Sequence, residues 1–281
     1  MDKHIFAFWQ KHNGFPCSFP MDYKDWQESW VRDIDGDGRF LFSSLRTELS
    51  FDATGAITAL IRYGKTAFGF DDSGECSADV HYNVIRDLCF EDAGSAARLL
   101  RSALAHFPAG ERIYAFFHYF GMSACGRHGK LHERNLQIQT LLLENGFTVE
   151  HENVYYTKDL SAFKPQNSPV VLRWGARSAG NCREFAAAIH GDEVCWGQLH
   201  FLPQGDIAYL RWIYVDEQRQ HAGIGSQVMH ALFTALPEMG ICRLDTDTAL
   251  DNRTARHFYE KNGFDHCGIT RSFYTKSRPP A

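Results

Sequence analysis

The stretch that decides the fold covers residues 211–226 and reads RWIYVDEQRQHAGIGS. It begins inside an apolar, β-branched and aromatic run, which predicts a buried strand over Ile207–Val215. A glycine turn follows, in which Gln220, Gly223 and Gly225 have the spacing Q-x-x-G-x-G. Apolar residues then recur at helical spacing, so we expect a helix that begins near Gly225 and stops at Pro237.

A strand, a glycine turn and a helix N-terminus together can form an anion site. Glycines let the backbone approach a phosphate group, and the free N–H groups and dipole of the helix face that group. The turn matches neither of the longer nucleotide fingerprints, GxGxxG or GxxxxGK(S/T). Taken alone, it is equally consistent with a tight turn that binds no ligand.

A second stretch follows at residues 252–264 and reads NRTARHFYEKNGF. The two stretches together resemble the signature of the GNAT acyltransferases (Gcn5-related N-acetyltransferases). That signature is V-x-x-x-x-(R/Q)-x-x-G-x-(G/A), followed by N-x-x-A-x-x-(F/L)-Y-x-x-x-G-F. The resemblance covers about residues 170–276, with Glu217 where many members have proline and Ala222 where a basic residue is common.

The order of predicted elements repeats along the chain, and both halves end a helix with Asn-Gly-Phe, at 145–147 and 262–264. The resemblance therefore implies an α/β fold of two tandem GNAT-like domains, each a mixed, mostly antiparallel central sheet flanked by helices. We place a degenerate domain without a cofactor site at 1–160 and an acyl-CoA-binding domain at 169–281. A polar linker, 158–168, would join them. The second domain lacks the two helices that usually follow the first GNAT strand.

The individual elements are predicted from periodicity and from turn residues. The expected helices cover residues 5–11, 23–32, 94–107, 136–144, the segment after Gly225, and part of 252–264. The expected strands cover 39–51, 57–63, 81–90, 112–117, 170–174, 184–190, 194–201, 207–215, one beginning near 241, 265–269 and 272–276. Residues Gly191 and Asp192 are expected to form a hairpin turn.

The first half departs from the signature at the glycine turn. Glu91 and Asp92 follow its strand without a Q-x-x-G-x-G spacing, and two carboxylates there would repel a pyrophosphate. The first half also needs 52 residues from Gly94 to Gly146, against 38 from Gly225 to Gly263. The excess falls around 120–133. We expect this half to bind no cofactor and to shape the acceptor cleft, with 120–133 or 15–25 reaching the acyl end.

Two short patterns raise the question of a metal. Residues 120–133 include Cys125, His128 and His132, with His118 nearby, which could supply three zinc ligands, but a structural site needs a fourth. A surface loop, or a loop that lines the acceptor site, is the favoured interpretation, and we predict no metal. Residues 33–39, DIDGDGR, lack the glutamate that closes a calcium loop, so they predict a hairpin turn.

The resemblance implies acetyl-CoA as co-substrate. Amides of residues 220–226 would bind its pyrophosphate, Val215 would present backbone to the pantetheine, and amides of 213–215 would polarise the thioester carbonyl. Asn252 would either bond the pantetheine arm or cap its own helix. The expected cofactor-binding residues are Ile213, Tyr214, Val215, Gln220, His221, Ala222, Gly223, Ile224, Gly225, Ser226, Asn252, Ala255, Phe258 and Tyr259.

Tyr259 stands where the family often carries the acid that protonates the leaving thiolate. A phenol with a reference pKa near 10 can fill that role, and the alternative is an aromatic side chain packed in the core. The sequence does not single out a general base: Glu184, His200 and Asp245 are candidates. No Cys–His–acid or Ser–His–acid spacing indicates an acyl-enzyme, which favours direct transfer.

Composition bears on the class of protein and on its location in the cell. A chain of 281 residues with 44% hydrophobic and 22% charged residues is ordinary for a soluble globular protein, and no apolar run approaches a membrane span. The start lacks the apolar core of a signal peptide, and eight scattered cysteines without a CxxC pair indicate reduced thiols. We therefore expect a cytoplasmic protein.

The charge balance differs along the chain. From Pro169 onward acidic and basic residues are equal in number, so the net charge of −5 lies wholly in the first 168 residues. Without a basic stripe, nucleic-acid binding is disfavoured. The sequence thus predicts a monomeric or homodimeric N-acetyltransferase that moves an acetyl group from acetyl-CoA directly to a primary amine of a small molecule or peptide. The alternative is a non-catalytic acyl-CoA or metabolite-binding protein of the same fold.

Overall fold

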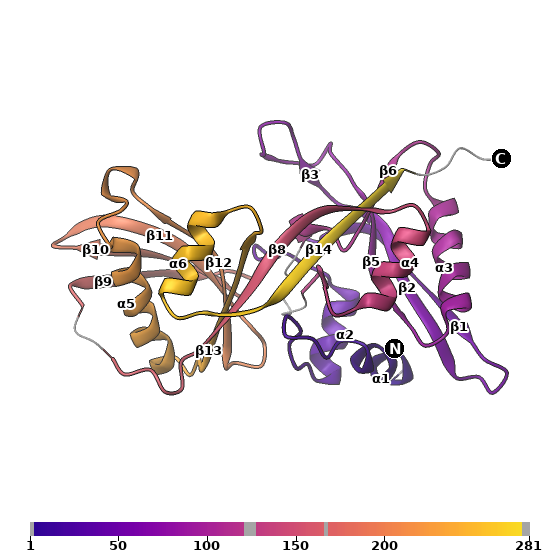
Figure 1. The fold of residues 1–281 in the computed structure, drawn as a ribbon, viewed down its shortest axis with the longest axis horizontal. Helices are drawn as coiled ribbons and strands as arrows, with labels where there is room; N and C mark the ends of the chain where they lie inside the picture. The colour runs from indigo at the N-terminus through magenta and orange to yellow at the C-terminus, as the bar shows by residue number, and fades with distance from the viewer. Residues whose placement is uncertain (1–2, 121–127, 166–167, 277–281) are drawn as a thin grey trace.

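The computed structural model describes residues 3–120, 128–165 and 168–276 (Figure 1). Twelve strands within these ranges form one continuous sheet that passes through both halves of the chain. Its order is β1-β2-β5-β6-β14-β8-β13-β12-β11-β10-β9, and β7 pairs with β14 beside this path. The two longest strands, β8 and β14, lie side by side at its centre (Figure 1). The α/β class and the tandem arrangement are confirmed.

The first half begins with two helices, and strands and helices follow. They are α1 (Lys3–Lys11), α2 (Tyr23–Val31), β1 (Phe42–Phe51), β2 (Ile57–Thr66), β3 (Gly69–Phe70), β4 (Cys76–Ser77), β5 (Asn83–Phe90), α3 (Ala93–His106), β6 (Arg112–Ala115), η1 (His118–Phe120), β7 (Leu131–His132), α4 (Leu136–Glu144) and β8 (Thr148–Asp159). The predicted helices agree with these bounds to within two residues at each end.

The second half begins with an antiparallel meander and ends with two strand–helix units. Its elements are β9 (Val170–Arg177), β10 (Cys182–Ile189), β11 (Asp192–Phe201), β12 (Ile207–Val215), η2 (Glu217–Arg219), α5 (Ile224–Glu238), β13 (Arg243–Ala249), α6 (Arg253–Lys261) and β14 (Asp265–Lys276). Within residues 170–189, all of them described, a four-residue loop joins β9 directly to β10, so the two helices that usually follow the first GNAT strand are absent there, as the sequence predicted.

The central strands differ from the expectation. Residues 148–159, for which no strand was expected, form β8, and the two expected closing strands, 265–269 and 272–276, are the single strand β14. Strand β8 leaves the first half to pair with β13, whereas β14 returns from the second half to pair with β6. The two halves thus exchange strands. Strand β8 ends the first half of the chain but pairs within the second-half sheet, and β14 ends the second half of the chain but pairs within the first-half sheet.

Two local predictions need correction. Ile189 pairs with Asp192, so the turn between β10 and β11 consists of His190 and Gly191, both with positive φ, and not of Gly191 and Asp192. The segment 158–168 is more than a polar linker, because its first residues belong to β8, Leu160 is 1% exposed, and Phe163 packs on the second-half core. The hairpin turn at 33–39 is confirmed by the bridge between Ile34 and Phe40.

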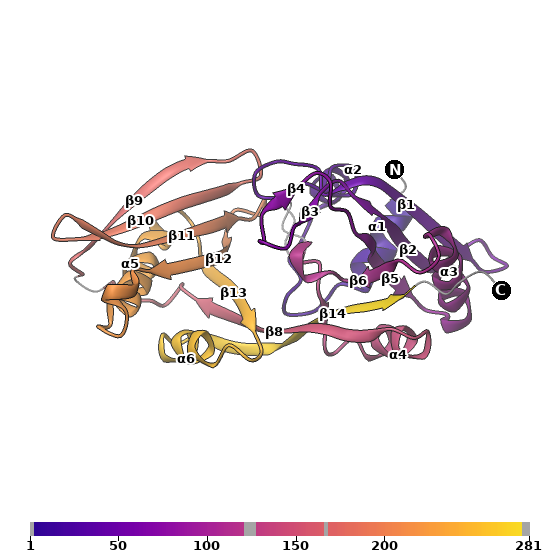
Figure 2. The ribbon, with the colours of Figure 1, turned by 90° about the horizontal axis from the view of Figure 1, so that it is seen from above.

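Helices cover the sheet where its strands are most apolar. In the first half α3 and α4 pack on one face of β2, β5 and β6, while α1 and α2 pack on the other through aromatic side chains. In the second half α5 and α6 cover one face only. Helices α4 and α6 lie along the same side of the central strands (Figure 2). The opposite face of the second-half sheet turns toward the first half, and Phe19 and Cys17 pack there against Tyr209.

Candidate active site

Strands β12 and β13 are parallel neighbours that separate part of the way along their length. Their pairing ends at Leu210 and Thr246, although β12 continues to Val215. The Thr246 hydroxyl donates to the Leu210 carbonyl at 3.0 Å, at the point where the strands part. We call the parting of these strands the second-half splay. Beyond it, the backbone of β12 has β11 as a neighbour on one side only.

Backbone alternation decides which amides of β12 face the splay. The amide of Asp216 donates to the Val194 carbonyl at 3.0 Å. Because alternate residues of an antiparallel strand bond to the same neighbour, the amide of Tyr214 also points toward β11. The amides of Ile213 and Val215 then point into the splay. Of the three amides expected to polarise a carbonyl group, those of Ile213 and Val215 therefore face the splay and that of Tyr214 does not.

The glycine turn brings the start of α5 against the end of β12. Gly223 is the N-cap of α5 in a left-handed conformation, with φ 78°, and no side chain caps this helix end. A Cβ at Gly225 would lie 2.9 Å from Cε2 of Phe258 and 3.6 Å from Cγ2 of Val215, so glycine permits close packing there. The Gln220 side chain donates to the Val215 carbonyl at 3.0 Å and fixes the turn to the strand.

This helix start is open to an anionic group. Residues 220–223 are exposed, and a Cβ added at Gly223 would meet nothing within 4 Å. The first N–H groups of α5, which lack a side-chain cap, and the positive end of the helix dipole therefore face open space beside the splay. Residues Gln220, His221, Ala222, Gly223, Ile224, Gly225 and Ser226 would hold the phosphates by backbone contacts at this end of the sheet.

Helix α6 carries the other predicted contacts. The Asn252 side chain accepts a hydrogen bond from the Ala255 amide at 3.0 Å, so of its two predicted roles the structure shows the helix cap. Phe258 packs against Gly225 across the two helix starts. Tyr259 is 6% exposed and contacts the rings of Phe258, Phe264 and Tyr156. It is packed in the core, and its hydroxyl lies within hydrogen-bonding reach of Thr246.

The Tyr259 hydroxyl therefore lies at the apex of the splay. Burial raises the pKa of this phenol, the hydrogen bond with Thr246 lowers it, and the nearby Asp247 carboxylate raises it. The net shift is upward. Tyr259 thus stays protonated at neutral pH and has a proton to donate.

The candidate bases lie on the face of the sheet opposite α5, but in different surroundings. His200 is 1% exposed and pairs across the sheet with Cys182 and Tyr209. Asp245 is fully buried and accepts hydrogen bonds from Tyr155, Thr157 and Arg243 at 2.7 to 2.9 Å. Burial raises its pKa above the usual range.

Glu184 differs from the other two candidates because it is exposed on β10. It pairs with Gln198 of β11, which pairs with Trp212 of β12, so these three side chains share one face of the sheet. Trp212 is 42% exposed and belongs to the part of β12 beyond the splay. Of the three candidates, Glu184 is the one that solvent reaches.

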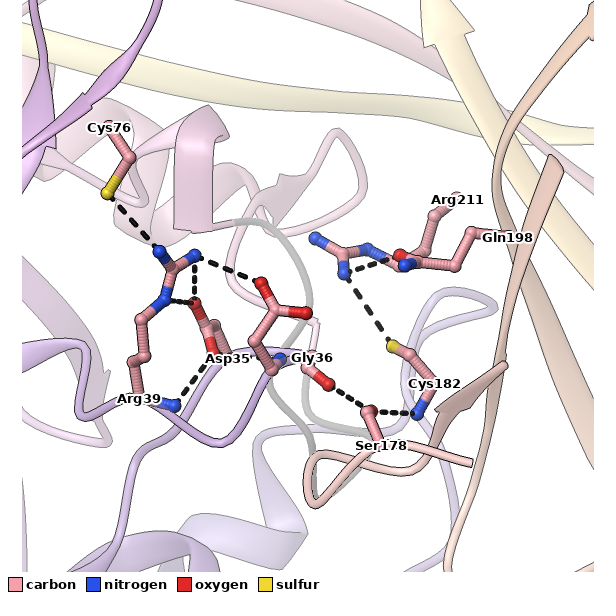
Figure 3. Close-up of polar contacts among 9 residues, drawn as sticks. Asp35, Gly36, Arg39, Cys76, Ser178, Cys182, Gln198 and Arg211 are labelled. Carbon is pink, nitrogen blue, oxygen red and sulfur yellow. Dashed lines mark hydrogen bonds and ion pairs between the residues drawn. The ribbon is translucent and has the colours of Figure 1, made fainter. Parts of the chain in front are cut away.

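A turn of the first half contacts the loop between β9 and β10, beside this face (Figure 3). Arg211 donates to Gln198 at 2.8 Å and to the Cys182 sulfur at 3.6 Å. The Ser178 hydroxyl donates to the carbonyl of Gly36, which belongs to the 33–39 turn. In that turn Arg39 pairs with Asp35 at 2.8 Å. The first half is therefore built directly onto the second-half sheet beside the face that carries Glu184 and Gln198.

Two interactions at the apex of the second-half splay were not predicted from the sequence. Lys130, from the predicted loop 120–133, forms an ion pair with Asp247 of β13, and Tyr209 donates to the same carboxylate at 2.5 Å. Lys130 and Asp247 are 117 positions apart in sequence, and neither lies in a recognisable motif. The sequence signal near Lys130 is the greater length of the first half between Gly94 and Gly146, compared with Gly225 to Gly263 in the second half.

The first half has the same construction, but its helix start and its splay are covered. Strands β5 and β6 pair only as far as Ile85 and Ala115, although β5 continues to Phe90. We call this the first-half splay. Residues 12–18 pack beside it and leave a cavity of about 40 Å³, lined also by parts of β5 and by 128–132. Helix α3 is capped by Asp92, whose side chain accepts from the Ser95 amide at 2.7 Å.

The zinc interpretation finds no support in the residues that the structure describes, where no group of three or more His, Cys, Asp or Glu side chains could hold a metal ion. Cys125 lies outside them. His118 contacts Glu150 at 3.3 Å, His132 contacts the Cys267 carbonyl at 2.9 Å, and His128 contacts Asp247 at 3.9 Å. These histidines thus have separate partners.

The comparisons with known proteins agree with the family that the two sequence motifs resemble. Residues 143–264 match the sequence model of the Acetyltransferase (GNAT) family, so the chain contains a GNAT domain there. A search of curated proteins finds no match. The family match supports acyl transfer as the general class of reaction.

Solved structures match nearly the whole chain. A tandem GNAT protein from the clavulanic acid biosynthesis pathway has 10% identity and a TM-score of 0.65, with 99% of this chain and 94% of that chain covered. A GCN5-related N-acetyltransferase from Sphaerobacter thermophilus has 11% identity and a TM-score of 0.60, with 98% and 91% covered. A glucosamine N-acetyltransferase region of a fungal multi-domain β-N-acetylglucosaminidase has 11% identity and a TM-score of 0.65, with 97% and 36% covered. These likenesses confirm the tandem GNAT fold.

No helix within the described ranges combines the length and the apolarity that a membrane crossing requires. The seven cysteines in those ranges are all free thiols.

Proposed function

We propose that the protein is an N-acetyltransferase that moves an acetyl group from acetyl-CoA directly to a primary amine of a small molecule or peptide. The observation that carries this proposal is that three features meet at one place. The uncapped start of α5 lies against the end of β12, the amides of Ile213 and Val215 face the splay, and the Tyr259 hydroxyl reaches Thr246 at its apex. An anion site, a carbonyl-polarising group and a proton donor are what acyl transfer from a thioester requires.

Each group then has a defined task. The α5 start binds the pyrophosphate, and the inward amides of β12 polarise the thioester carbonyl. Tyr259 donates a proton to the departing thiolate. The amine must lose a proton as it attacks, and we propose Glu184, which solvent reaches, as the base, with His200 as the second candidate.

The division of labour between the halves is also part of this proposal. Residues 169–281 supply the acyl-CoA site, completed by β8, and residues 1–160 form a degenerate GNAT-like domain without a cofactor site. The acceptor lies on the face where Glu184 and Trp212 are exposed, against the 33–39 turn. Free thiols and ordinary composition support a cytoplasmic location, with no metal, nucleic acid or membrane as partner, for a monomer or homodimer.

The test is an assay of free thiol released from acetyl-CoA in the presence of a panel of primary amines, with mass spectrometry of the acceptor. We expect amine-dependent release and one acetylated amine. A protein that binds acetyl-CoA but releases thiol no faster with any amine than without would be a binding protein, and the enzymatic proposal would be wrong.

A further inference from the structure

Lys130 and Asp247 form a buried ion pair that crosses between the two halves. Lys130 precedes β7 in the first half and Asp247 lies on β13, and their side chains are only 6% and 9% exposed. The Asp247 carboxylate also accepts the Tyr209 hydroxyl at 2.5 Å and lies 3.9 Å from Nε2 of His128. One carboxylate therefore joins a cation of the first half to strand β12 of the second-half splay.

A buried ion pair of this kind needs an explanation beyond stability. Removing two charges from water costs about as much as their attraction returns, so an apolar pair of similar volume is often at least as stable. Burial raises the pKa of Asp247, but Lys130 and His128 outweigh it and hold this pKa below its usual range. Because the pKa of His128 is about 3, Lys130 supplies the compensating charge at neutral pH.

Asp247 lies where its charge matters for chemistry. It follows Thr246, the residue at which β12 and β13 part, and Tyr259 reaches Thr246 from the other side. The Asp247 carboxylate acts electrostatically on the Tyr259 hydroxyl. An anion without a counter-charge at this point would oppose any negative charge that develops in the splay.

We propose that Lys130 of the first half is a positioning residue for the transfer reaction in the second half. It compensates Asp247, so that this carboxylate can orient Tyr209 without placing net negative charge at the apex of the splay. The proposal rests on the proposed function and deepens it, because it makes the first half part of the active site. The link runs through a defined contact and does not require the first half to bind a cofactor.

Several other titratable groups face Asp247 from the elements around it. They are His128, Cys17, Tyr155, His151, Tyr209, Asp245 and Tyr259. The pKa of His128 is about 3 and that of Cys17 about 12, and burial raises the pKa of each of the three tyrosines further above 10. None of the variants below replaces His151 or Asp245. An ionisation that appears in Lys130→Met and disappears when Asp247 is also replaced can therefore be assigned to Asp247.

The experiment measures kcat and the KM for acetyl-CoA between about pH 6.5 and pH 9 for four full-length proteins. They are the wild type, Lys130→Met, Lys130→Arg and the double variant Lys130→Met with Asp247→Asn. In Lys130→Met, burial without a counter-charge raises the pKa of Asp247, so kcat should fall with rising pH as the carboxylate ionises. A loss on the order of tenfold is expected from one unpaired charge near the reacting atoms.

The remaining variants separate the charge effect from damage to the fold. Lys130→Arg keeps the cation and should keep the wild-type pH profile, while the double variant removes both charges and should lack the new ionisation. KM for acetyl-CoA should stay within about twofold throughout, because the pyrophosphate site is untouched. A Lys130→Met profile that follows the wild type contradicts the proposal.

The double variant keeps the test decisive if Lys130→Met does not fold. Its wild-type-like pH profile and kcat within about tenfold of the wild type support compensation, whereas a loss of about a hundredfold or more shows that the pair acts in another way. If the wild type itself acetylates no amine, the proposed function fails and this inference fails with it. An active wild type with an unaltered Lys130→Met profile overturns this inference alone.

Discussion

The two halves of the molecule share one construction and differ at the two points where a coenzyme would be held. In both, a parallel strand pair parts after a few residues, and a helix begins beyond the first of the two strands. In the second half Gly223 begins that helix without a side-chain cap. In the first half Asp92 caps it, and Glu91 beside it pairs with Lys11 at 2.6 Å.

The two splays also differ in how far neighbouring residues cover them. Residues 12–18 of the chain pack beside the first-half splay and leave only a small cavity. Residues 220–223, beside the second-half splay, are exposed. The same topology is thus covered and capped in the first half and open in the second. We propose that the open helix start next to the open strand edge is what allows the second half to hold a coenzyme.

The largest expected effect concerns the start of α5. Gly223→Val places a β-branched side chain at φ 78°, which forces the turn to rearrange where amides must meet the pyrophosphate. We expect the affinity for acetyl-CoA to fall by at least about a hundredfold, measured by calorimetry. Gly205→Val is the matched control, because Gly205 has φ 84° and equally open surroundings but begins no helix. Equal losses in both variants would contradict the anion site.

Tyr259→Phe tests the proton donor at the apex. Removing the hydroxyl should lower kcat by on the order of 10²–10⁴, the usual contribution of one proton transfer, with little change in acetyl-CoA affinity. Stopped assays of acetylated amine together with calorimetry measure the two quantities separately. A variant that keeps more than about half its activity would mean that Tyr259 serves the core and that the thiolate leaves unaided.

The contact between the halves can be tested at Gly180. A Cβ there would lie 2.2 Å from the Asp35 carbonyl oxygen and 2.4 Å from the backbone of Gly36, both in the first half. Gly180→Ala should therefore lower the free energy of unfolding by about 1–3 kcal/mol, because backbone must move. The control is Gly14→Ala, where a Cβ meets nothing within 4 Å and a change within about 0.5 kcal/mol is expected. Urea unfolding of both variants decides this.

His128 should make stability depend on pH. Burial lowers its pKa from 6.5 to about 3, so below pH 6.5 the unfolded chain takes up a proton that the folded chain does not. The contribution of neutral His128 to the free energy of unfolding is fully present above pH 6.5 and is lost as the pH falls toward 3. At pH 5 the loss is about 2 kcal/mol. Comparing the urea unfolding of the wild type and His128→Gln at pH 7.5 and 5 isolates this contribution; equal pH dependence would show that His128 titrates normally.

Much of the fold could be predicted from sequence because its signals are local. The glycine turn at 220–225, the Asn-Gly-Phe endings and the apolar faces of α3 and α5 each report on a few neighbouring residues. Strand β8 could not be predicted in this way. Its first six residues read TVEHEN, and their apolar content is low because several of them are exposed or half-buried.

Long-range pairing explains the other omissions. No local pattern predicts that β14 pairs with β6, because the sequence of a strand does not identify its neighbour in the sheet. The ion pair of Lys130 with Asp247 depends on how the halves meet. The glycine turn of the proposed coenzyme site is therefore predictable from sequence, whereas the contacts between the two halves depend on how the halves assemble.

We propose that the chain has one coenzyme site, in the second half. Isothermal titration of the full-length protein with acetyl-CoA gives the number of sites. We expect one site per chain in the wild type and binding at least about a hundredfold weaker in Gly223→Val. Two sites per chain would mean that the first half also binds the coenzyme, and wild-type affinity in Gly223→Val would mean that the start of α5 does not hold it; either result would contradict the proposal.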